Sequence, residues 1–280
     1  MNLSLLTLNL HTYQEHPYHC CFETMHQHER EVNIIADAIA HLGIDVICFQ
    51  EVGEYMHDPI STPYGESPSN MAFRICTKLR QRGLWYHIHQ DWSHIGFQRW
   101  REGTAILSRY PMQHNYSAYV SVDHRKDNYM SRNITVSCID VPWFGLLHIA
   151  NAHLSWAHHG FYEEFANLRR LIRSRQHFGV RADLIAGDFN APAGDYAYQH
   201  IVGNGEYVDQ FYELHPHRFY EPSYQGQIDG WKNYPPKRID YIFKRSGSPL
   251  QIRTMDIIFN NNFYPMVSDH FGYLAKFDLY

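Results

Sequence analysis

Short apolar runs of strand length dominate this sequence, and segments with the spacing of an amphipathic helix divide them into groups. Helical spacing runs over residues 23–42, 70–82 and 161–178, and glycine follows the first two segments. Strand character is found in residues 1–10, 44–49, 84–89, 104–108, 115–122, 132–141, 146–153, 184–188, 238–243, 254–259 and 270–277. Helices interspersed with groups of adjacent strands predict two mixed β-sheets packed face to face, with helices outside. We expect one α/β domain over residues 1–280.

Charge and the first residues limit the classes of protein to consider. The 280 residues include 24 Lys and Arg against 29 Asp and Glu, which gives a net charge of −5. This balance argues mildly against a nucleic-acid-binding protein, which usually carries a basic stripe. The opening stretch MNLSLLTLNLH lacks the basic start and the cleavage site of a signal peptide. Its apolar run is also too short to span a membrane, so we expect no membrane partner.

The cysteines indicate a reducing compartment. There are five, an odd number, and no two of them form a Cys-x-x-Cys pair: Cys20, Cys21, Cys48, Cys76 and Cys138. This pattern is typical of reduced thiols and not of a disulfide framework. We therefore predict a cytoplasmic protein.

The stretch LIAGDFNAPAGD, residues 184–195, delivers two polar side chains to the end of a buried strand. The apolar run stops at Asp188, Asn190 follows two residues later, and proline and glycine then prevent regular structure. In α/β proteins ligands bind outside the carboxyl ends of strands, which makes both residues candidates for a site. The alternative is an Asx-turn, in which the same side chains only satisfy the backbone of a tight loop. This stretch by itself does not separate the two interpretations.

Polar residues also stand at the ends of several other apolar runs. They are Asn9, Gln50 and Glu51, Asn151 and His153, Asp240, and Ser268, Asp269 and His270. Any one of them is more readily explained by local structure than by function. Their recurrence at so many strand ends indicates a shared site.

Seven stretches follow one another in the order of a known family: TLNLH, FQEV, EGTAILSRYP, NAHLSW, GDFN, RIDYIF and SDHFGYLAKF. They run from Asn9 to Phe277, nearly the whole chain, and together they resemble the endonuclease/exonuclease/phosphatase superfamily of metal-dependent phosphoesterases. The resemblance implies a four-layer α/β sandwich of two packed mixed β-sheets flanked by helices. It also implies a site at the edge where the strand ends of both sheets meet.

Hydrolysis of a phosphate ester needs neutralised charge, an activated water and protonation of the leaving oxygen. Oxygen ligands such as Glu51 and Asn9 suit a hard cation, Mg²⁺ or Mn²⁺. The family pattern implies that Glu51 is the principal ligand. Asp269 is then either a second metal ligand or the group that fixes the tautomer of His270.

The resemblance implies catalytic roles for residues at the other strand ends. His270 would act as a general base, oriented by Asp240. Asp188 would position or deprotonate the attacking water, and Asn190 would donate a hydrogen bond to the phosphoryl oxygens. His153 would contact the same phosphate and stabilise developing charge, with a core histidine as the second interpretation.

Local stretches suggest the kind of phosphate ester. DWSHIGFQRWREGTAILSR and IDGWKNYPPKRIDYIFK resemble a bacterial branch of the superfamily that includes maltose 6′-phosphate phosphatase. The expected site loops offer His94, Trp156 and Trp231, and aromatic faces with polar donors suit a sugar ring in a pocket. Arg132 is a candidate phosphate contact, with an ordinary surface arginine as an equal alternative.

We therefore predict a phosphomonoesterase that acts on a small sugar phosphate. A nuclease would be expected to carry basic loops that follow a nucleic-acid backbone, so a nucleic-acid partner is the less favoured one. A metal-dependent nuclease or phosphodiesterase with the same site is the alternative. A catalytically inactive scaffold is a third possibility, but none of Glu51, Asp188 and His270 is missing.

Overall fold

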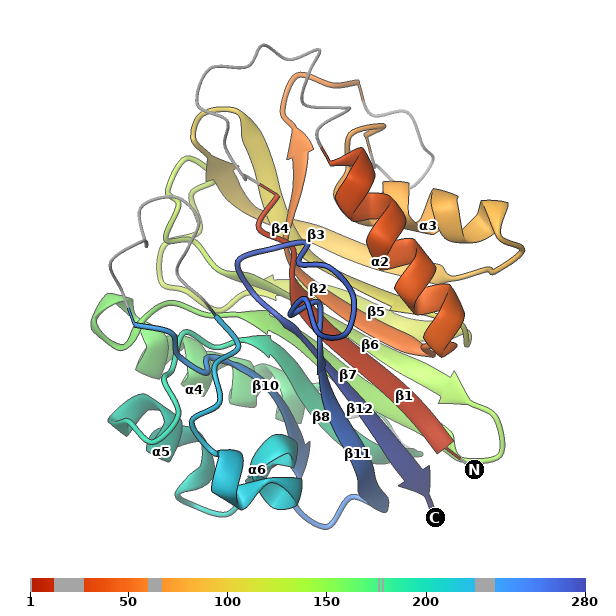
Figure 1. The fold of residues 1–280 in the computed structure, drawn as a ribbon. Coiled ribbons are helices and arrows are strands. Elements are labelled where there is room, and N and C mark those ends of the chain that lie inside the picture. Colours follow the sequence, from red (N-terminus) through yellow and green to blue (C-terminus); the bar gives the residue numbers. More distant parts are fainter. Residues whose placement is uncertain (1, 13–27, 60–66, 176, 178, 225–234) are drawn as a thin grey trace.

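The computed structural model describes residues 2–12, 28–59, 67–175, 177, 179–224 and 235–280. The strands form two six-stranded sheets, each with one parallel pair among its described strands and antiparallel pairs elsewhere. The sheets pack face to face, with helices on their outer faces (Figure 1). The predicted sandwich of two packed mixed sheets flanked by helices is confirmed.

Both sheets have a parallel pair at their centre. The first sheet has the order β11 (Leu250–Ile258), β12 (Gly272–Leu279), β1 (Asn2–Asn9), β2 (Val46–Tyr55), β4 (Trp100–Ser108) and β3 (His87–Gly96). The second has the order β5 (Met112–Tyr119), β6 (Asn133–Val141), β7 (Gly145–His153), β8 (Val180–Asp188), β10 (Asp240–Arg245) and β9 (Tyr207–Asp209). The parallel pairs are β1 with β2 and β7 with β8.

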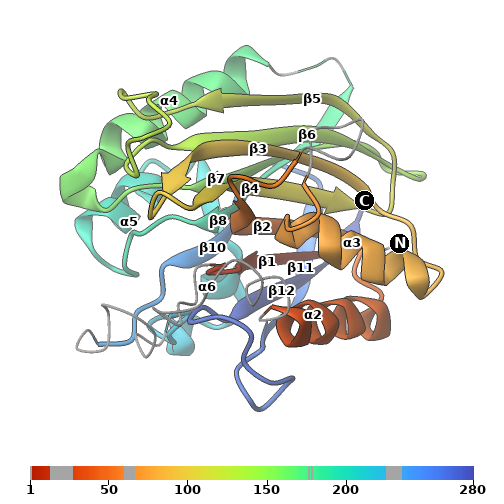
Figure 2. The same ribbon diagram turned by 90° about the horizontal axis from the view of Figure 1, so that it is seen from above.

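Helices cover the outer face of each sheet. The apolar stripes of α2 (Glu29–Leu42) and α3 (Met71–Gln81) pack on the first sheet, and those of α4 (Phe161–Ser174) and α5 (Tyr196–Val202) pack on the second. Figure 2 shows α2 and α4 beyond opposite sides of the two sheets. Short helical segments, among them α6 (Gln210–Leu214), Ala157–His159 and Pro216–Arg218, complete the chain. Among the described residues, no helix is both long and apolar enough to cross a membrane.

The observed helices differ from the predicted ones mainly at their ends. The first begins at Glu29, and the predicted residues 23–27 lie outside the described residues. It ends at Leu42 because Gly43 adopts the left-handed conformation, with φ of +62°. The second begins where the side chain of Asn70 accepts a hydrogen bond from the backbone N–H of Phe73. The helix predicted over residues 161–178 stops at Ser174.

Two of the four edge strands, β3 and β5, also differ from the prediction. β3 and β5 cover residues 87–96 and 112–119, whereas the apolar pattern predicted strands over residues 84–89 and 115–122. Each strand lies at the edge of its sheet, where many side chains face solvent. An edge strand therefore lacks the continuous apolar run of a central strand, and its limits are poorly marked in the sequence.

The strand registers bring the predicted site residues to one edge of the sandwich. In the first sheet Asn9 at the end of β1 is paired with Gln50 on β2. In the second sheet Asp188 at the end of β8 is paired with His153 on one side and with Asp240 on the other. Because these strands are in register, their polar ends lie close together.

A buried polar link joins the two sheets. The side chain of Gln50 on β2 donates a hydrogen bond to Oδ1 of Asn151 on β7 at 2.7 Å. Nδ2 of Asn151 donates to the backbone carbonyls of Phe49 and Ala105 at 2.8 and 2.9 Å. Both side chains are fully buried, so no water can replace these partners. The link therefore fixes how the two sheets face one another.

Replacing Asn151 by leucine should lower the free energy of unfolding by about 2–4 kcal/mol, because two carbonyls and the amide of Gln50 lose their buried partner. Denaturation by urea, followed by circular dichroism, measures this loss. Asn115→Leu is the matched control, since Asn115 is exposed on β5 and its replacement should change the free energy by less than about 0.5 kcal/mol. Equal losses at the two positions would contradict the role of the link.

Candidate active site

A cavity of about 590 Å³ lies at the edge where the strand ends meet. Its walls come from both sheets and from the segment before β12. The polar and aromatic residues that line it include His11, Glu51, His94, Glu102, Arg132, His153, Trp156, Asp188, Asn190, Tyr224, Asp269 and His270. Asn9 and Asp240 are fully buried behind this lining and contact residues in it. The structure thus brings most of the predicted site residues together.

Glu51 enters the cavity through an irregularity in β2. The pairing of β2 with β4 shifts register around this residue, and Glu51 has a left-handed backbone with φ of +47°. Its Oε1 accepts a hydrogen bond from Nδ2 of Asn9 at 2.9 Å, and its Oε2 lies 3.3 Å from Nδ1 of His11. Burial raises the pKa of Glu51, but the bond with His11 and the charges of His11 and His153 outweigh it and hold the pKa well below its usual range. Glu51 is therefore a charged carboxylate.

The two carboxylate oxygens of Asp188 have different partners. Oδ1 accepts a hydrogen bond from the backbone N–H of Asn190 at 2.9 Å, which closes the turn after β8. Oδ2 accepts one from Nδ2 of Asn9 at 3.1 Å and lies 3.8 Å from Nε2 of both His153 and His270. One oxygen belongs to an Asx-turn and the other faces the cavity. For residues 184–195, the turn and the ligand site are therefore compatible interpretations.

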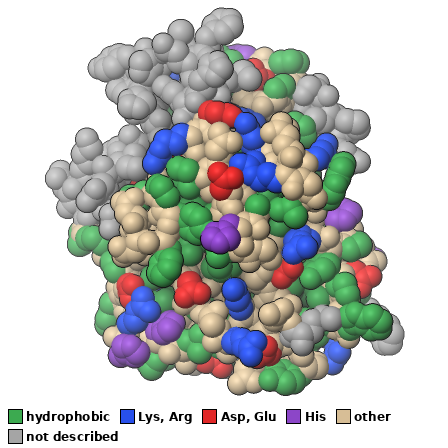
Figure 3. All heavy atoms as spheres, turned by 45° about the vertical axis from the view of Figure 1, so that its right-hand side comes forward, with side chains coloured by type: hydrophobic (Ala, Val, Ile, Leu, Met, Phe, Trp, Pro, Cys, Tyr) green, Lys and Arg blue, Asp and Glu red, His purple; other side chains and the backbone are tan. Residues whose placement is uncertain are grey.

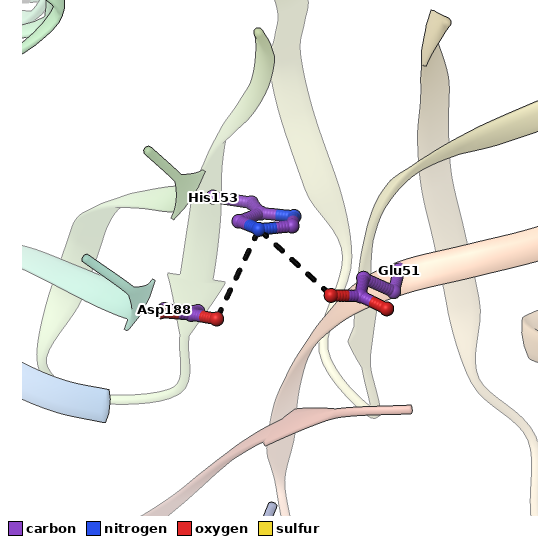
Figure 4. Close-up of side chains that lie close together, drawn as sticks. All are labelled: Glu51, His153 and Asp188. Carbon is purple, nitrogen blue, oxygen red and sulfur yellow. Dashed lines mark ion pairs between the residues drawn. The ribbon is translucent and has the colours of Figure 1, made fainter. Parts of the chain in front are cut away.

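His153 lies between carboxylates at the end of β7 (Figure 4). Its Nε2 is 3.9 Å from Oε1 of Glu51 and 3.8 Å from Oδ2 of Asp188. Its other ring nitrogen, Nδ1, is 3.7 Å from Oε1 of Glu102 on β4. Burial lowers the pKa of His153 to about 4, and the positive charge of Arg132 acts in the same direction. The imidazole is therefore neutral near pH 7.

A chain of buried hydrogen bonds holds His270. Its Nδ1 lies 2.8 Å from Oδ2 of Asp240, and the hydroxyl of Ser223 donates to the same oxygen at 2.6 Å. Burial lowers the pKa of His270, but the negative charges of Asp240 and Asp269 outweigh it and raise the pKa to about 10. Asp240 therefore fixes the ring so that Nε2 faces Asp188.

Two sets of side chains have ligand atoms close enough together for one metal ion. In Glu51, His153 and Asp188, and again in Asp188, Asp240 and His270, these atoms lie within 4.8 Å of one another. Asp269 belongs to neither set, but it shares a neighbour with Glu51, because Nδ1 of His11 lies 3.6 Å from Oδ1 of Asp269 and 3.3 Å from Oε2 of Glu51. The donors are mostly carboxylate oxygens, with imidazole nitrogens between them.

The residues predicted to bind substrate are distributed around the cavity. Arg132 lines it, although the residue is only 8% exposed, and its Nε has no hydrogen-bond partner among the described residues. Trp156 lines the cavity with the ammonium group of Lys237 5.4 Å from its ring centre. His94 also lines it, but it is 4% exposed and bonded within the protein. Trp231 lies outside the described residues.

Sequence reasoning missed several residues of the cavity. His11 lies two positions after Asn9, Glu102 lies inside β4, and Tyr224 belongs to the segment between the last helices and β10. The signal for His11 and Glu102 was their place within or beside the family-like stretches TLNLH and EGTAILSRYP. Gln50 and Asn151 stand at strand ends but link the sheets and do not line the cavity.

Solved structures with the same fold match almost the whole chain. An endonuclease/exonuclease/phosphatase family protein from Leptotrichia buccalis is 25% identical with a TM-score of 0.80, and the match covers 99% of this chain and 100% of that one. A mannosyl-6-phosphatase from Bacteroides thetaiotaomicron is 13% identical with a TM-score of 0.63 and coverage of 99% and 100%. TDP2 from D. rerio, complexed with a single-strand DNA product, is 18% identical with a TM-score of 0.62 and coverage of 99% and 99%. The last two likenesses show a shared fold alone.

Sequence comparison assigns the family. Curated protein sequences give no match to the chain. The sequence model of the Endonuclease/Exonuclease/phosphatase family matches residues 25–270, well over half of the chain, and the span includes the cavity residues from Glu51 to His270. Members of this family are hydrolases that act on phosphoesters. The fold agrees with this match, because two packed mixed sheets surround a cavity lined by carboxylates and histidines. The chain therefore belongs to the Endonuclease/Exonuclease/phosphatase family.

Proposed function

We propose that the protein is a divalent-metal-dependent phosphomonoesterase that hydrolyses a small sugar phosphate. The observation that carries the proposal is the cavity of about 590 Å³, in which carboxylates and histidines lie beside the buried guanidinium of Arg132. A phosphate ester needs both kinds of group, because cationic groups hold the anion while carboxylates and histidines bind metal and transfer protons.

Glu51, Asn9 and Asp269 are the proposed ligands of Mg²⁺ or Mn²⁺. The donor set fits such an ion: Glu51 is held in its charged form, and hard cations prefer carboxylate and amide oxygens. Asn9 now turns its amide nitrogen towards Glu51 and Asp188, so as a ligand it would present its oxygen after rotation of the amide. When bound, the cation would neutralise negative charge on the phosphoryl oxygens.

The remaining polar groups of the cavity would carry the chemistry. Asp188 orients the attacking water with Oδ2, because Oδ1 is bonded within the turn after β8 and Oδ2 faces the cavity. His270, held by Asp240, carries a proton at Nε2. His153 contacts the phosphoryl group from the end of β7. Asn190 donates one amide N–H to a backbone carbonyl, and its second N–H would bond a phosphoryl oxygen.

The cavity walls favour a small ring-shaped substrate. Phe97, Tyr129 and Trp156 line the cavity beside the polar groups, and aromatic faces pack well against the apolar face of a sugar ring. The buried Nε of Arg132 is suited to bond an anion, since a buried N–H without a hydrogen-bond partner is costly. The shared fold with a mannosyl-6-phosphatase supports a sugar phosphate as the substrate class.

A nuclease or phosphodiesterase is the second candidate, because the fold is shared with TDP2, whose structure holds a single-strand DNA product. Figure 3 shows one face of the molecule, on which basic and acidic side chains are interspersed. The net charge of −5 likewise supplies no general attraction for a polyanion. These observations favour the small substrate.

The thiols support the proposal that the protein acts in the cytoplasm. Cys48 and Cys138 are free and buried, and Cys76 is also buried. Cys20 and Cys21 lie outside the described residues. Free buried thiols are usual in a reducing compartment.

Glu51→Gln should weaken the binding of Mg²⁺ and Mn²⁺ by about 10-fold or more, because the amide removes the charge of the principal ligand. Isothermal titration calorimetry of the metal alone measures this affinity. Glu163→Gln is the control, since Glu163 is an exposed carboxylate on α4 outside the cavity. Undiminished affinity in the Glu51 variant would remove this residue from the metal site.

His153→Ala and His270→Ala should each raise the activation barrier by about 3–5 kcal/mol, seen as a fall in kcat, with little change in Tm. His148→Ala is the matched control, because His148 is a fully buried histidine on the same strand as His153 and is held by Asp183 at 3.0 Å outside the cavity. That control should lower Tm and leave kcat nearly unchanged. If all three variants unfold alike, the two cavity histidines serve the fold and not the reaction.

The substrate class is tested by comparing kcat/KM on a panel of hexose and disaccharide phosphates with the rate of nicking of supercoiled plasmid in the same Mg²⁺ buffer. We expect phosphate release from at least one sugar phosphate and negligible nicking, because the aromatic cavity holds a small ring while the net charge of the chain is negative. Efficient nicking without phosphate release would identify a nuclease and overturn the proposal.

A further inference from the structure

His94 is a buried histidine of β3 whose two ring nitrogens both face acceptors of the protein. Nδ1 lies 3.2 Å from the backbone carbonyl of Ser131. Nε2 lies 3.4 Å from Oε2 of Glu102. A carbonyl and a carboxylate can only accept hydrogen bonds, so both ring nitrogens face acceptors of the protein. Although His94 lines the cavity, no ring nitrogen remains to bond a substrate.

The two oxygens of Glu102 connect His94 with His153. Oε2 faces His94 at 3.4 Å, and Oε1 lies 3.7 Å from Nδ1 of His153. All three side chains are at least nine-tenths buried, so water competes little for these contacts. Glu102 faces Nδ1 of His153, while Glu51 and Asp188 face Nε2, so the carboxylate of Glu102 helps to fix the orientation of the His153 ring.

The backbone of β3 is shaped to place His94 opposite Glu102. The two residues are paired across β3 and β4, directly after a register shift between Trp92 and His94. Gly103 makes this close approach possible, because a Cβ at this position would lie 1.8 Å from the backbone oxygen of Asp91. The alignment is therefore specified by the backbone as well as by the ion pair.

We propose that His94 is a positioning residue that acts through Glu102 on His153, the histidine assigned to the phosphoryl group. This inference rests on the proposed function. His94 holds the carboxylate of Glu102 in one orientation, and Glu102 in turn fixes the orientation of the His153 ring. His94 therefore affects the rate of the chemical step and not the affinity for the substrate.

The split between kcat and KM tests the proposal first. His94→Leu should lower kcat by about 10- to 100-fold, the scale on which groups that orient a functional histidine act, with KM changed little. His94→Gln should restore most of kcat, because its amide N–H can still bond Glu102. His89→Leu is the matched control, since His89 lies on the same strand, bonds the carbonyl of Tyr116 and is not part of the cavity lining. A rise in KM with unchanged kcat in His94→Leu would make His94 a substrate contact and overturn the proposal.

A double-mutant comparison tests whether the effect passes through His153. In a His153→Gln background, adding His94→Leu should lower kcat no further, because the residue that His94 positions is already gone. If the two changes multiply, His94 acts by another route and the proposal is wrong. His94→Ala, which also lacks a group that can bond Glu102, serves in place of His94→Leu if the leucine variant fails to fold.

A spectroscopic measurement separates the failure of this inference from the failure of the proposed function. The ¹H and ¹⁵N shifts of labelled histidine, in protein without metal or substrate, report the surroundings of the His153 ring, and the spectrum of His153→Gln identifies its signals. We expect these signals to move or broaden in His94→Leu and to keep their wild-type positions in His89→Leu. Unchanged signals in His94→Leu overturn the positioning role. If the signals change as expected but the wild type hydrolyses no phosphate ester, the positioning role stands and the proposed function falls.

Discussion

Two parallel strand pairs, one at the centre of each sheet, determine where the polar side chains of the cavity lie. The end of β1 is paired with Gln50 on β2, beside the irregularity at Glu51, and β7 and β8 end side by side in the other sheet. The hydrogen bond from Gln50 to Asn151 then holds these two regions face to face. If either sheet slipped by one residue, every polar group at its edge would turn to the opposite face.

The same edge concentrates charge and strain that a stable core would avoid. Three residues that are not glycine adopt left-handed backbones there, namely His11, Glu51 and Asn190, with φ of +42°, +47° and +48°. Such conformations cost about 1–3 kcal/mol each and persist only where the surrounding structure enforces them. Here the hydrogen bond that the backbone N–H of His11 donates to Oδ1 of Asn9, and the turn closed by Asp188, supply part of that enforcement. All three residues line the cavity, and such strained positions are typical of functional sites.

The sequence predicts the fold well where burial is continuous and poorly where it is not. Central strands such as β2 and β8 show apolar runs because both faces are covered, whereas the edge strands β3 and β5 consist mainly of half-buried and exposed residues and were misplaced. Site residues at strand ends, such as Asp188, were visible because a polar group interrupts an apolar run. Glu102 was not, because it lies within β4, and only the three-dimensional contact with His153 and His94 reveals its surroundings. Local pattern carries no information about such contacts across the sandwich.

The cavity takes its walls from both sheets, with Glu51 from one and His153 and Asp188 from the other. Any molecule that occupies it therefore ties the two halves of the sandwich together. At a concentration 100 times its dissociation constant, a ligand stabilises the folded state by about 2.7 kcal/mol through mass action alone. Some backbone amides on the inner strands of both sheets exchange hydrogen only when the sheets separate. Ligand binding slows exchange at these amides, even far from the cavity, by the amount that corresponds to the added stability. A substrate or an ion bound between the two sheets therefore makes the two halves of the sandwich unfold together.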